Sequence, residues 1–409
     1  MGVERALEQP FSFSVEERCP VTAARRGLLK TGHGEIPTPV FMPVGTVGSV
    51  KAVTFEQVWA SGSRLILGNT YHLYLRPGHE LVGRLGGLHR FEGWDGALLT
   101  DSAGFQVFSL AQLNRIDDDG VTFRSHLDGS RHHFTPELSM RIQLDLGADI
   151  VMAFDQCASY GAEHGAVAEA VSRTTAWLKR CREILPGRLE RDGWQRVLFG
   201  IMQGGVDESL RRLSAEQIVE LDLPGYAIGG LSVGEPTEAM YEITELSAGL
   251  LPDPKPRYLM GVGFPDDIIA GVRAGVDMFD CVLPTRMART GTVLTRDGRL
   301  VVKNMAYAED TGPLDPDCDC PVCRRHSRAY LRHLFQAREM LGPTLATIHN
   351  LHFYQDLMAG IREAISAGCF PSHARRVTTR WREGERARLE EVAGRRRPGG
   401  GGPEVDPDG

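Results

Sequence analysis

Three cysteines of the chain lie within six residues of one another, a spacing that is typical of metal ligands. They are Cys318, Cys320 and Cys323, and the chain begins with no apolar secretory signal, so disulfides are not the expected use. A nearby segment supplies His349 and His352, either of which could complete a tetrahedral zinc site with three sulfurs. Four protein ligands leave no open coordination position, so the catalytic groups are expected elsewhere.

Three aspartates, each placed after a short apolar run, are the candidates for catalysis. Asp101 and Asp280 suit a pair in which one carboxylate attacks an anomeric carbon and the other transfers protons. Such an attack passes through an oxocarbenium-like state, which a neighbouring carboxylate stabilises electrostatically. The alternative is that each aspartate only caps the N-terminus of a helix. That alternative explains any one of Asp101, Asp155 and Asp280 more easily than all three together.

Asp155 is expected to bind a flat heterocycle together with Gln203 and the backbone of Gly229 and Gly230. A carboxylate accepts two N–H donors, whereas an amide side chain or a backbone N–H donates to a carbonyl oxygen. This pattern complements the edge of a guanine-like base, which carries N–H donors beside a carbonyl. Glycine allows the backbone to approach such a ring closely.

Short apolar runs position these groups, and each run ends in a polar or glycine-rich turn. Amphipathic segments separate many of them, which predicts a parallel sheet covered by helices on both faces. We expect strands at residues 39–44, 64–67, 97–100, 149–154, 196–202, 226–228, 257–260 and 276–279. Eight strands predict an α/β fold, a (β/α)8 TIM barrel with its functional groups at the carboxyl ends of the strands. A doubly wound open sheet is the alternative, and Pro39 and Pro43 are awkward in a central strand.

Basic residues gather in the segment 284–351, which we predict to be a zinc-binding insertion after the eighth strand. Five arginines and no acid lie between residues 324 and 338. A basic insertion could position a phosphate backbone, although a solvated surface explains most charge runs. Because Arg286 and Arg289 follow Asp280 closely, nucleic acid bound to them would reach the catalytic carboxylates.

The composition is that of an ordinary globular protein, with 42% hydrophobic and 24% charged residues among 409. A formal net charge of −7 gives no overall attraction to polyanions. The other five cysteines are scattered, as expected in a reducing cytoplasm, and no apolar run approaches the roughly 20 residues that span a bilayer. We expect an N-terminal extension at 1–20, a catalytic domain at 21–393 that includes the insertion, and a disordered tail at 394–409.

The chain resembles the bacterial tRNA-guanine transglycosylases, enzymes of queuosine biosynthesis, over about residues 22–357. The metal pattern matches, with three cysteines followed by Thr-Ile-His-Asn at 347–350. Long strings also match: FMPVGT at 41–46, LGNTYH at 67–72, DSAGFQVFS at 101–109, QGG at 203–205, GGLSVGE at 229–235 and VDMFDCVLPTR at 276–286.

This resemblance implies a barrel enzyme that exchanges guanine at the wobble position of tRNAs with GUN anticodons. Asp280 corresponds to the nucleophile that attacks C1′ of guanosine, and Asp101 to the carboxylate that handles protons. The base-binding positions fall on Ser102, Phe105 (which stacks on the base), Asp155, Cys157, Gln203, Gly229, Gly230, Leu231, Val233 and Met260. The ligands of one structural zinc ion fall on Cys318, Cys320, Cys323 and His349, which favours His349 over His352.

The resemblance also implies how RNA and a second subunit bind. Thr285, Arg286 and Arg289 occupy positions that contact the uridine–guanosine–uridine element of the anticodon loop. Family members act as homodimers that engage one tRNA at a time, and Tyr330 and His333 fall in the dimer-forming region. The expected location is the cytoplasm, with no membrane partner.

The incoming base is expected to be the 7-deazaguanine preQ1. Queuine-using relatives carry a smaller residue at the position of Val233 and a different one at Cys157, whereas this chain follows the bacterial pattern at both. Two residues depart from that pattern. Ala103 replaces a glycine of the usual Asp-Ser-Gly-Gly string. Gln156 replaces a glutamate that is expected to help read the 7-substituent through a neighbouring peptide.

Two other classes of function make different demands on the sequence. A non-catalytic RNA-binding subunit, as in heterodimeric relatives, should lack the nucleophile, whereas Asp280 and Asp101 are both present. A metal-dependent barrel hydrolase needs an open metal site with histidine or aspartate ligands at the strand ends, and the sequence shows no such set.

Overall fold

The computed structural model describes residues 11–110, 115–185 and 195–395. Most of the predicted tail at 394–409 and the first half of the predicted extension at 1–20 lie outside these residues. The second half of that extension contains a strand, β1 (Ser12–Arg18), which pairs with β2 (Arg25–Thr31). The folded part of the chain therefore begins before residue 21, the predicted start of the catalytic domain.

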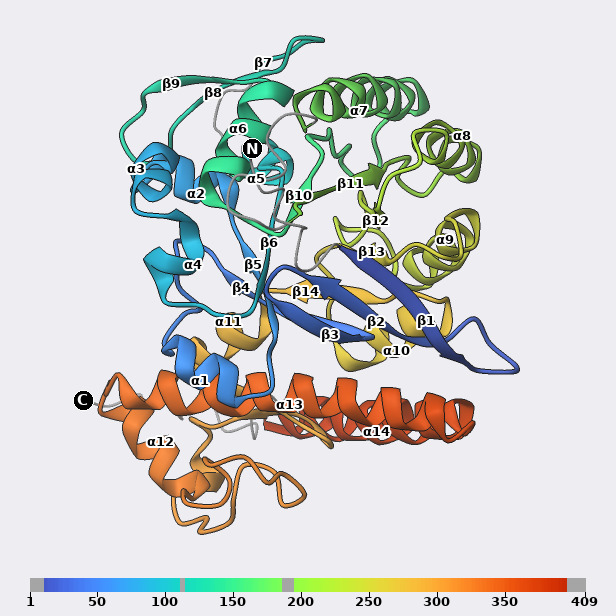
Figure 1. Cartoon of the computed structure of the whole chain (residues 1–409). Coiled ribbons are helices and arrows are strands. Elements are labelled where there is room, and N and C mark those ends of the chain that lie inside the picture. Colours follow the sequence, from blue (N-terminus) through green and yellow to red (C-terminus); the bar gives the residue numbers. More distant parts are fainter. Residues whose placement is uncertain (1–10, 111–114, 186–194, 396–409) are drawn as a thin grey trace, which may run out of the picture.

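Eight parallel strands close into a barrel, which confirms the predicted fold (Figure 1). The strands are β4 (Val40–Gly45), β5 (Leu65–Gly68), β6 (Ala97–Thr100), β10 (Ile150–Met152), β11 (Val197–Met202), β12 (Gly225–Ile228), β13 (Arg257–Leu259) and β14 (Met278–Cys281). The last strand pairs with the first, since Phe279 lies opposite Phe41. This closure excludes the open doubly wound sheet. Pro43 lies inside β4 despite its missing N–H.

Helices cover the outside of the barrel, and a polar side chain caps the start of some of them. For example, α8 (Glu208–Val219) begins after Asp207, whose carboxylate accepts the N–H of Leu210. The other long barrel helices are α6 (Pro136–Leu146), α7 (His164–Ile184), α9 (Thr237–Leu250), α10 (Pro265–Arg273) and α13 (Leu341–Ser366). None of the helices in the described ranges combines the length and the apolar character that crossing a membrane would need.

A three-stranded antiparallel sheet, which we name the cap sheet, covers the amino-terminal end of the barrel. It consists of β1, β2 and β3 (Gly34–Thr38). Leu29 and Ile36 of this sheet join the cluster of apolar side chains that fills the barrel. Arg25 fixes the sheet in place, because its guanidinium binds the buried carboxylate of Asp277, just before β14, at 2.9 and 2.6 Å.

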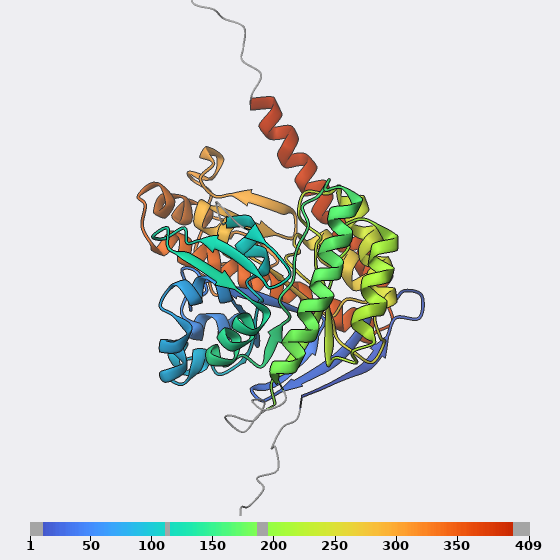
Figure 2. The ribbon, with the colours of Figure 1, turned by 90° about the horizontal axis from the view of Figure 1, so that it is seen from above.

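Two further segments lie outside the barrel. One is a small sheet of β7 (Arg115–Ile116), β8 (Val121–Arg124) and β9 (Arg131–Phe134), which follows α5 (Gly104–Leu110). The other follows β14 and contains α11 (Leu283–Thr290), β15 (Thr292–Thr295), β16 (Gly298–Val301) and α12 (Arg328–Gln336). The second segment and the cap sheet lie on opposite sides of the molecule (Figure 2). The final helix, α14 (Phe370–Arg395), packs against β16.

Candidate active site and metal centre

Polar side chains from different strands converge at the carboxyl end of the barrel. Asp101 directly follows β6, Asp155 lies shortly after β10, Gln203 directly follows β11, and Asp280 lies within β14. Gln203 bonds to Asp155, and the charge of Asp280 acts on Asp101. The structure thus brings the three predicted aspartates to one mouth, as expected for strands that end on the same face.

Two donors fix the carboxylate of Asp280. The Tyr258 hydroxyl donates to Oδ1 at 2.6 Å, and the Gly261 N–H donates to the same oxygen at 2.8 Å. Among the described residues Oδ2 has no donor, so this oxygen is available for bond formation. Burial raises the pKa of the Asp280 carboxyl, while both donors lower it by favouring the charged form. Sequence reasoning missed Tyr258, because a tyrosine inside a buried strand gives no separate signal.

Asp101 is held by the loop after β5 and by its own turn. Asn69 Nδ2 donates to one carboxylate oxygen at 2.6 Å, and the N–H groups of Thr70 and Ala103 donate to the other at 2.8 and 3.2 Å. Burial raises the pKa of Asp101 to about 7, and the negative charge of Asp280 contributes to the rise. A carboxyl with a pKa near neutrality can both release and accept a proton at cellular pH.

Replacing Asp101 with asparagine is expected to change the pH dependence of stability. The pKa of Asp101 is about 7 in the folded state, above its value in the unfolded chain. The contribution of this carboxyl to the free energy of unfolding of the wild type therefore falls as the pH rises from about 4 to 7. Asp101→Asn should therefore raise the free energy of unfolding at about pH 8, by on the order of a few kcal/mol, and change it little at about pH 4. Urea titrations at both pH values measure the difference. An equal effect at the two pH values would contradict the prediction.

Asp155 accepts two side-chain hydrogen bonds and keeps capacity for more. Ser102 Oγ donates to Oδ1 at 2.8 Å, and Gln203 Nε2 donates to Oδ2 at 2.7 Å. Burial raises the pKa of Asp155 to about 6, while the two donors lower it. Each oxygen has a second lone pair, so the carboxylate can also accept two N–H groups from a base. Gly104 permits this arrangement, because a Cβ there would lie 2.6 Å from Oδ1.

The paired glycines after β12 make room for the side chain of Gln203. A Cβ on Gly229 would lie 2.9 Å from Gln203 Nε2, and a Cβ on Gly230 would lie 2.3 Å from Oε1. Gly230 also has a φ of +66°, which favours glycine. The sequence predicted close approach to a bound ring at these positions, and the structure shows close approach to the amide that binds Asp155.

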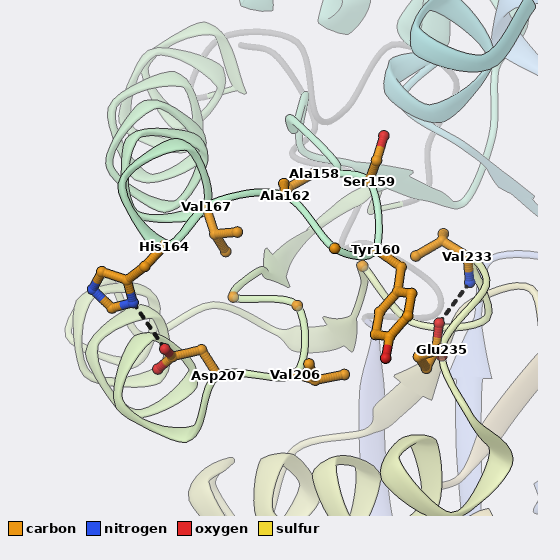
Figure 3. Close-up of a pocket in the computed structure, with 14 residues that line it drawn as sticks. Ala158, Ser159, Tyr160, Ala162, His164, Val167, Val206, Asp207, Val233 and Glu235 are labelled. Atoms are coloured by element: carbon orange, nitrogen blue, oxygen red, sulfur yellow. Dashed lines mark hydrogen bonds and ion pairs between the residues drawn. The ribbon is translucent and has the colours of Figure 1, made fainter.

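A cavity of about 250 Å³ lies between the loops that follow β10, β11 and β12 (Figure 3). Two residues that were predicted to bind the base, Gly230 and Val233, line it. His164 and Asp207 join two of these loops at the rim, with the imidazole Nδ1 2.9 Å from the carboxylate (Figure 3). The cavity therefore extends the predicted base site towards α7 and α8.

Glu235 shapes the loop after β12, although the sequence did not single it out. Its carboxylate accepts the N–H groups of Ser232 and Val233, the latter at 2.9 Å (Figure 3). Ser232 has a φ of 60°, a left-handed conformation that is uncommon outside glycine. Glu235 is the one acid in the glycine-rich string at 229–235, and this could have identified it, because a turn in such a string leaves N–H groups that need an acceptor.

The remaining predicted base-binding residues differ in exposure. Phe105 is 50% exposed at the start of α5, so its ring is accessible for stacking. Leu231 is buried, and Met260 is partly buried against the barrel interior. Burial raises the pKa of the Cys157 thiol to about 12, so this side chain stays neutral at cellular pH.

The two departures from the family pattern have different structural consequences. Ala103 is buried with a φ of 71°, a conformation that costs an alanine roughly 1–2 kcal/mol and that the usual glycine adopts freely. Gln156 is directed to α7, where its Oε1 accepts from Arg173 at 2.7 Å. The peptide beside Val233 is instead held by Glu235. The role expected for position 156 in reading the 7-substituent therefore has no counterpart in these contacts.

The three clustered cysteines and His349 have the geometry of a tetrahedral metal site. Their ligand atoms all lie within 4.8 Å of one another. His349 Nδ1 lies 3.7, 3.5 and 3.3 Å from the sulfurs of Cys318, Cys320 and Cys323. Zinc bound tetrahedrally at about 2.3 Å from sulfur and about 2.0 Å from nitrogen separates these atoms by roughly 3.5 Å. The donor set therefore fits a zinc ion.

The orientation of His349 explains why it joins this cluster and His352 does not. Its Nε2 lies 2.7 Å from the carbonyl oxygen of Leu294, so that nitrogen carries the hydrogen and Nδ1 presents its lone pair to the sulfurs. His352 instead contacts Asp319 at 2.8 Å. The next residue, Asn350, bonds to the Pro284 carbonyl at 2.9 Å, which connects the cluster to α11.

Residues predicted to contact RNA and a second subunit lie around this metal centre. Arg286 and Arg289 are exposed on α11. Thr285 is buried, and its hydroxyl donates to the Val282 carbonyl at 3.3 Å, so its side chain does not face solvent as an RNA contact requires. Tyr330 and His333 are both exposed on α12.

Comparison with known proteins identifies the family of this chain. The family model for queuine tRNA-ribosyltransferase matches residues 19–383. A queuine tRNA-ribosyltransferase of Pelotomaculum thermopropionicum is 57% identical, over 87% of this chain and 95% of its own. One from Symbiobacterium thermophilum is 53% identical over 94% of each chain, and one from Caldanaerobacter subterraneus is 57% identical over 87% of this chain and 93% of its own. This chain therefore belongs to the queuine tRNA-ribosyltransferase family.

Proposed function

We propose that the protein is a glycosyltransferase that replaces guanine at the wobble position of tRNAs with GUN anticodons by preQ1. The observation that carries this proposal is one pair of carboxylates at the barrel mouth. Asp280 offers an oxygen without a donor among the described residues, and Asp101 has a pKa of about 7. Asp155 lies beside them with the acceptors that a guanine edge needs. Membership of the family supports the same reaction class.

The reaction begins when Asp280 Oδ2 attacks C1′ of the wobble nucleoside. A C1′–oxygen bond forms as the glycosidic C–N bond breaks, and protonated Asp101 supplies a proton to the departing guanine. In the second half, the incoming base loses its N9 proton to Asp101 and attacks C1′, which releases the Asp280 carboxylate. A pKa of about 7 allows Asp101 to serve in both halves.

Base recognition is assigned to the residues around Asp155. Its carboxylate accepts the N1–H and the 2-amino group, while the Gln203 amide and the backbone N–H groups of the Gly230–Leu231 segment share the two lone pairs of O6. Burial of the pocket makes each unpaired group costly, at roughly 1–3 kcal/mol. A base that lacks any of these groups is therefore discriminated against.

We assign the metal as one structural zinc ion per chain, held by the cluster described above. The catalytic domain in this proposal comprises the predicted residues 21–393 together with β1 of the cap sheet, and the insertion at 284–351 places RNA over the mouth. We assign the contact of a homodimer to α12, on which Tyr330 and His333 are exposed. When bound, the zinc ion fixes the insertion and takes no part in the chemistry, because its ligand set is complete.

The two competing classes of function are less well supported. A non-catalytic subunit has no use for a paired Asp101 and Asp280. A barrel hydrolase needs a metal at the mouth, but the described residues offer only one further candidate ligand set, which includes Asp149. That residue precedes β10, so the set lies at the opposite end of the barrel.

A base-competition assay on one anticodon stem-loop tests the proposal. Guanine, preQ1, its nitrile precursor preQ0 and queuine are offered to the enzyme with RNA that carries labelled guanine. We expect release of the label and the highest kcat/KM with preQ1. No exchange of guanine would contradict the reaction, whereas preference for queuine would correct only the base.

Replacing Arg286 with alanine is expected to weaken tRNA binding by removing one phosphate contact. The slope of log Kd against log salt should become shallower by about one unit. Arg18→Ala is the matched control, because Arg18 is exposed on the cap sheet at the other end of the barrel. Filter binding at several salt concentrations measures both variants. Equal slopes for Arg286→Ala and wild type would show that this arginine is only a solvated charge.

A further inference from the structure

A buried arginine lies beneath the loops that bind the base in the proposed function. Arg211, near the start of α8, is 0% exposed. Among the described residues no carboxylate lies within ion-pair distance of its guanidinium; burial lowers the pKa of Arg211 to about 10, and the more distant charge of Glu235 opposes this shift only in part. Burying a charge without an ion-pair partner is costly unless its hydrogen bonds are well satisfied. The contacts of this side chain therefore indicate what it does.

The guanidinium binds three backbone carbonyls, one at the end of β11, one in the loop that follows it and one in the loop after β12. Nε donates to Gly205 O at 2.8 Å, and Nη1 donates to Met202 O at 3.2 Å, so these two bonds flank Gln203. Nη2 donates to Gly230 O at 3.3 Å in the loop after β12. Both loops line the cavity of Figure 3. One side chain thus ties together the two backbone segments that carry the predicted base-binding groups.

The geometry of the peptide group connects the hydrogen bonds of Arg211 to the orientation of the base-binding groups. In a trans peptide the C=O and the following N–H point in opposite directions. Because Arg211 attracts the Gly230 carbonyl, the N–H of Leu231 points away from Arg211. We propose that Arg211 is a positioning residue, which holds Gln203 and the Leu231 N–H in the orientation that reads the O6 edge of the base. It does so without touching the substrate, and the inference rests on the proposed base exchange.

Arginine is required for this role because its planar fork presents donors to several acceptors at once, whereas an ammonium acts as a point charge. The test is Arg211→Lys, which keeps the charge and loses the fork. Arg257→Lys is the matched control. Arg257 is also buried with a pKa of about 10 and donates to the carbonyls of Leu251 and Gly275, but at the amino-terminal end of β13.

Both lysine variants are expected to lower the melting temperature, but only Arg211→Lys should raise the KM for guanine, by roughly tenfold or more. The Kd for tRNA should stay within about twofold, because the RNA contacts are elsewhere. If Arg211→Lys does not fold, Arg211→Met, which keeps the length without the donors, is expected to show the same rise. A folded variant with the wild-type KM for guanine overturns the proposal. So does an equal rise in Arg257→Lys.

The wild-type enzyme separates this proposal from the function on which it rests. If the wild type exchanges no guanine, the proposed function fails. If it exchanges guanine and a folded Arg211→Lys shows the wild-type KM, only the positioning role fails.

Discussion

Replacing Asp280 with asparagine is expected to lower kcat for base exchange by about four orders of magnitude or more, because the covalent intermediate can no longer form. The amide is nearly isosteric, and its oxygen can still accept from Tyr258 and Gly261. The fold should therefore be retained while the nucleophile is lost. Release of labelled guanine from tRNA measures kcat. A covalent protein–RNA adduct, seen on denaturing gels with wild type, should be absent.

The matched control is Asp277→Asn, which alters the carboxylate that immediately precedes the same strand. Asp277 is buried and binds Arg25 of the cap sheet. Its replacement is expected to lower the free energy of unfolding by roughly 1–3 kcal/mol, since the Arg25 guanidinium then keeps only the exposed Asp253 as a charged partner, and to leave kcat within a few-fold of wild type. Undiminished exchange by Asp280→Asn would show that another group is the nucleophile. An equal loss in Asp277→Asn would attribute the defect to stability.

Replacing His349 with alanine is expected to release the metal and to disrupt the insertion. Structural zinc sites contribute about 10–16 kcal/mol to the folding of small domains, so loss of one ligand should destabilise this segment by several kcal/mol. Because Asn350 joins the same helix to α11, the positions of Arg286 and Arg289 should be lost with it. Metal content by atomic emission, tRNA binding and thermal unfolding measure these effects.

His352→Ala is the control for that experiment, because it removes an imidazole on the same helix that lies outside the cluster. It is expected to keep one metal ion per chain and wild-type tRNA affinity. Loss of metal from His352→Ala, or a full metal complement in His349→Ala, would reverse the ligand assignment. Loss of turnover in His349→Ala with unchanged tRNA binding would contradict a purely structural metal.

The barrel and its mouth could be predicted because both depend on local patterns. Strands buried on both faces give unbroken apolar runs, and parallel strands place their following residues on one face. The proximity of Asp101, Asp155 and Asp280 could therefore be predicted from the order of the strands alone. The cap sheet was missed because β1 is half exposed and alternates in burial, so its apolar residues form no run.

Residues that act through the backbone were harder to predict. Arg211 and Glu235 bind carbonyl and N–H groups of loops whose conformations no sequence pattern describes. Thr285 was placed among the RNA contacts by resemblance, but the turn of α11 directs it inwards. Cysteine spacing alone left His349 and His352 both open, and only the family resemblance favoured His349. The contact that orients this imidazole, with the Leu294 carbonyl, joins residues far apart in the chain.

The cap sheet limits the route by which bases can enter and leave the barrel. With Leu29 and Ile36 filling the amino-terminal end, the described residues leave the mouth as the way in and out of the barrel. In the proposed reaction, RNA bonded to Asp280 covers that same mouth. The released guanine must escape past the RNA strand that it has just left, and its replacement must follow the same path inwards. Both bases then use one opening, one after the other, so the departing base competes directly with the incoming base for the site.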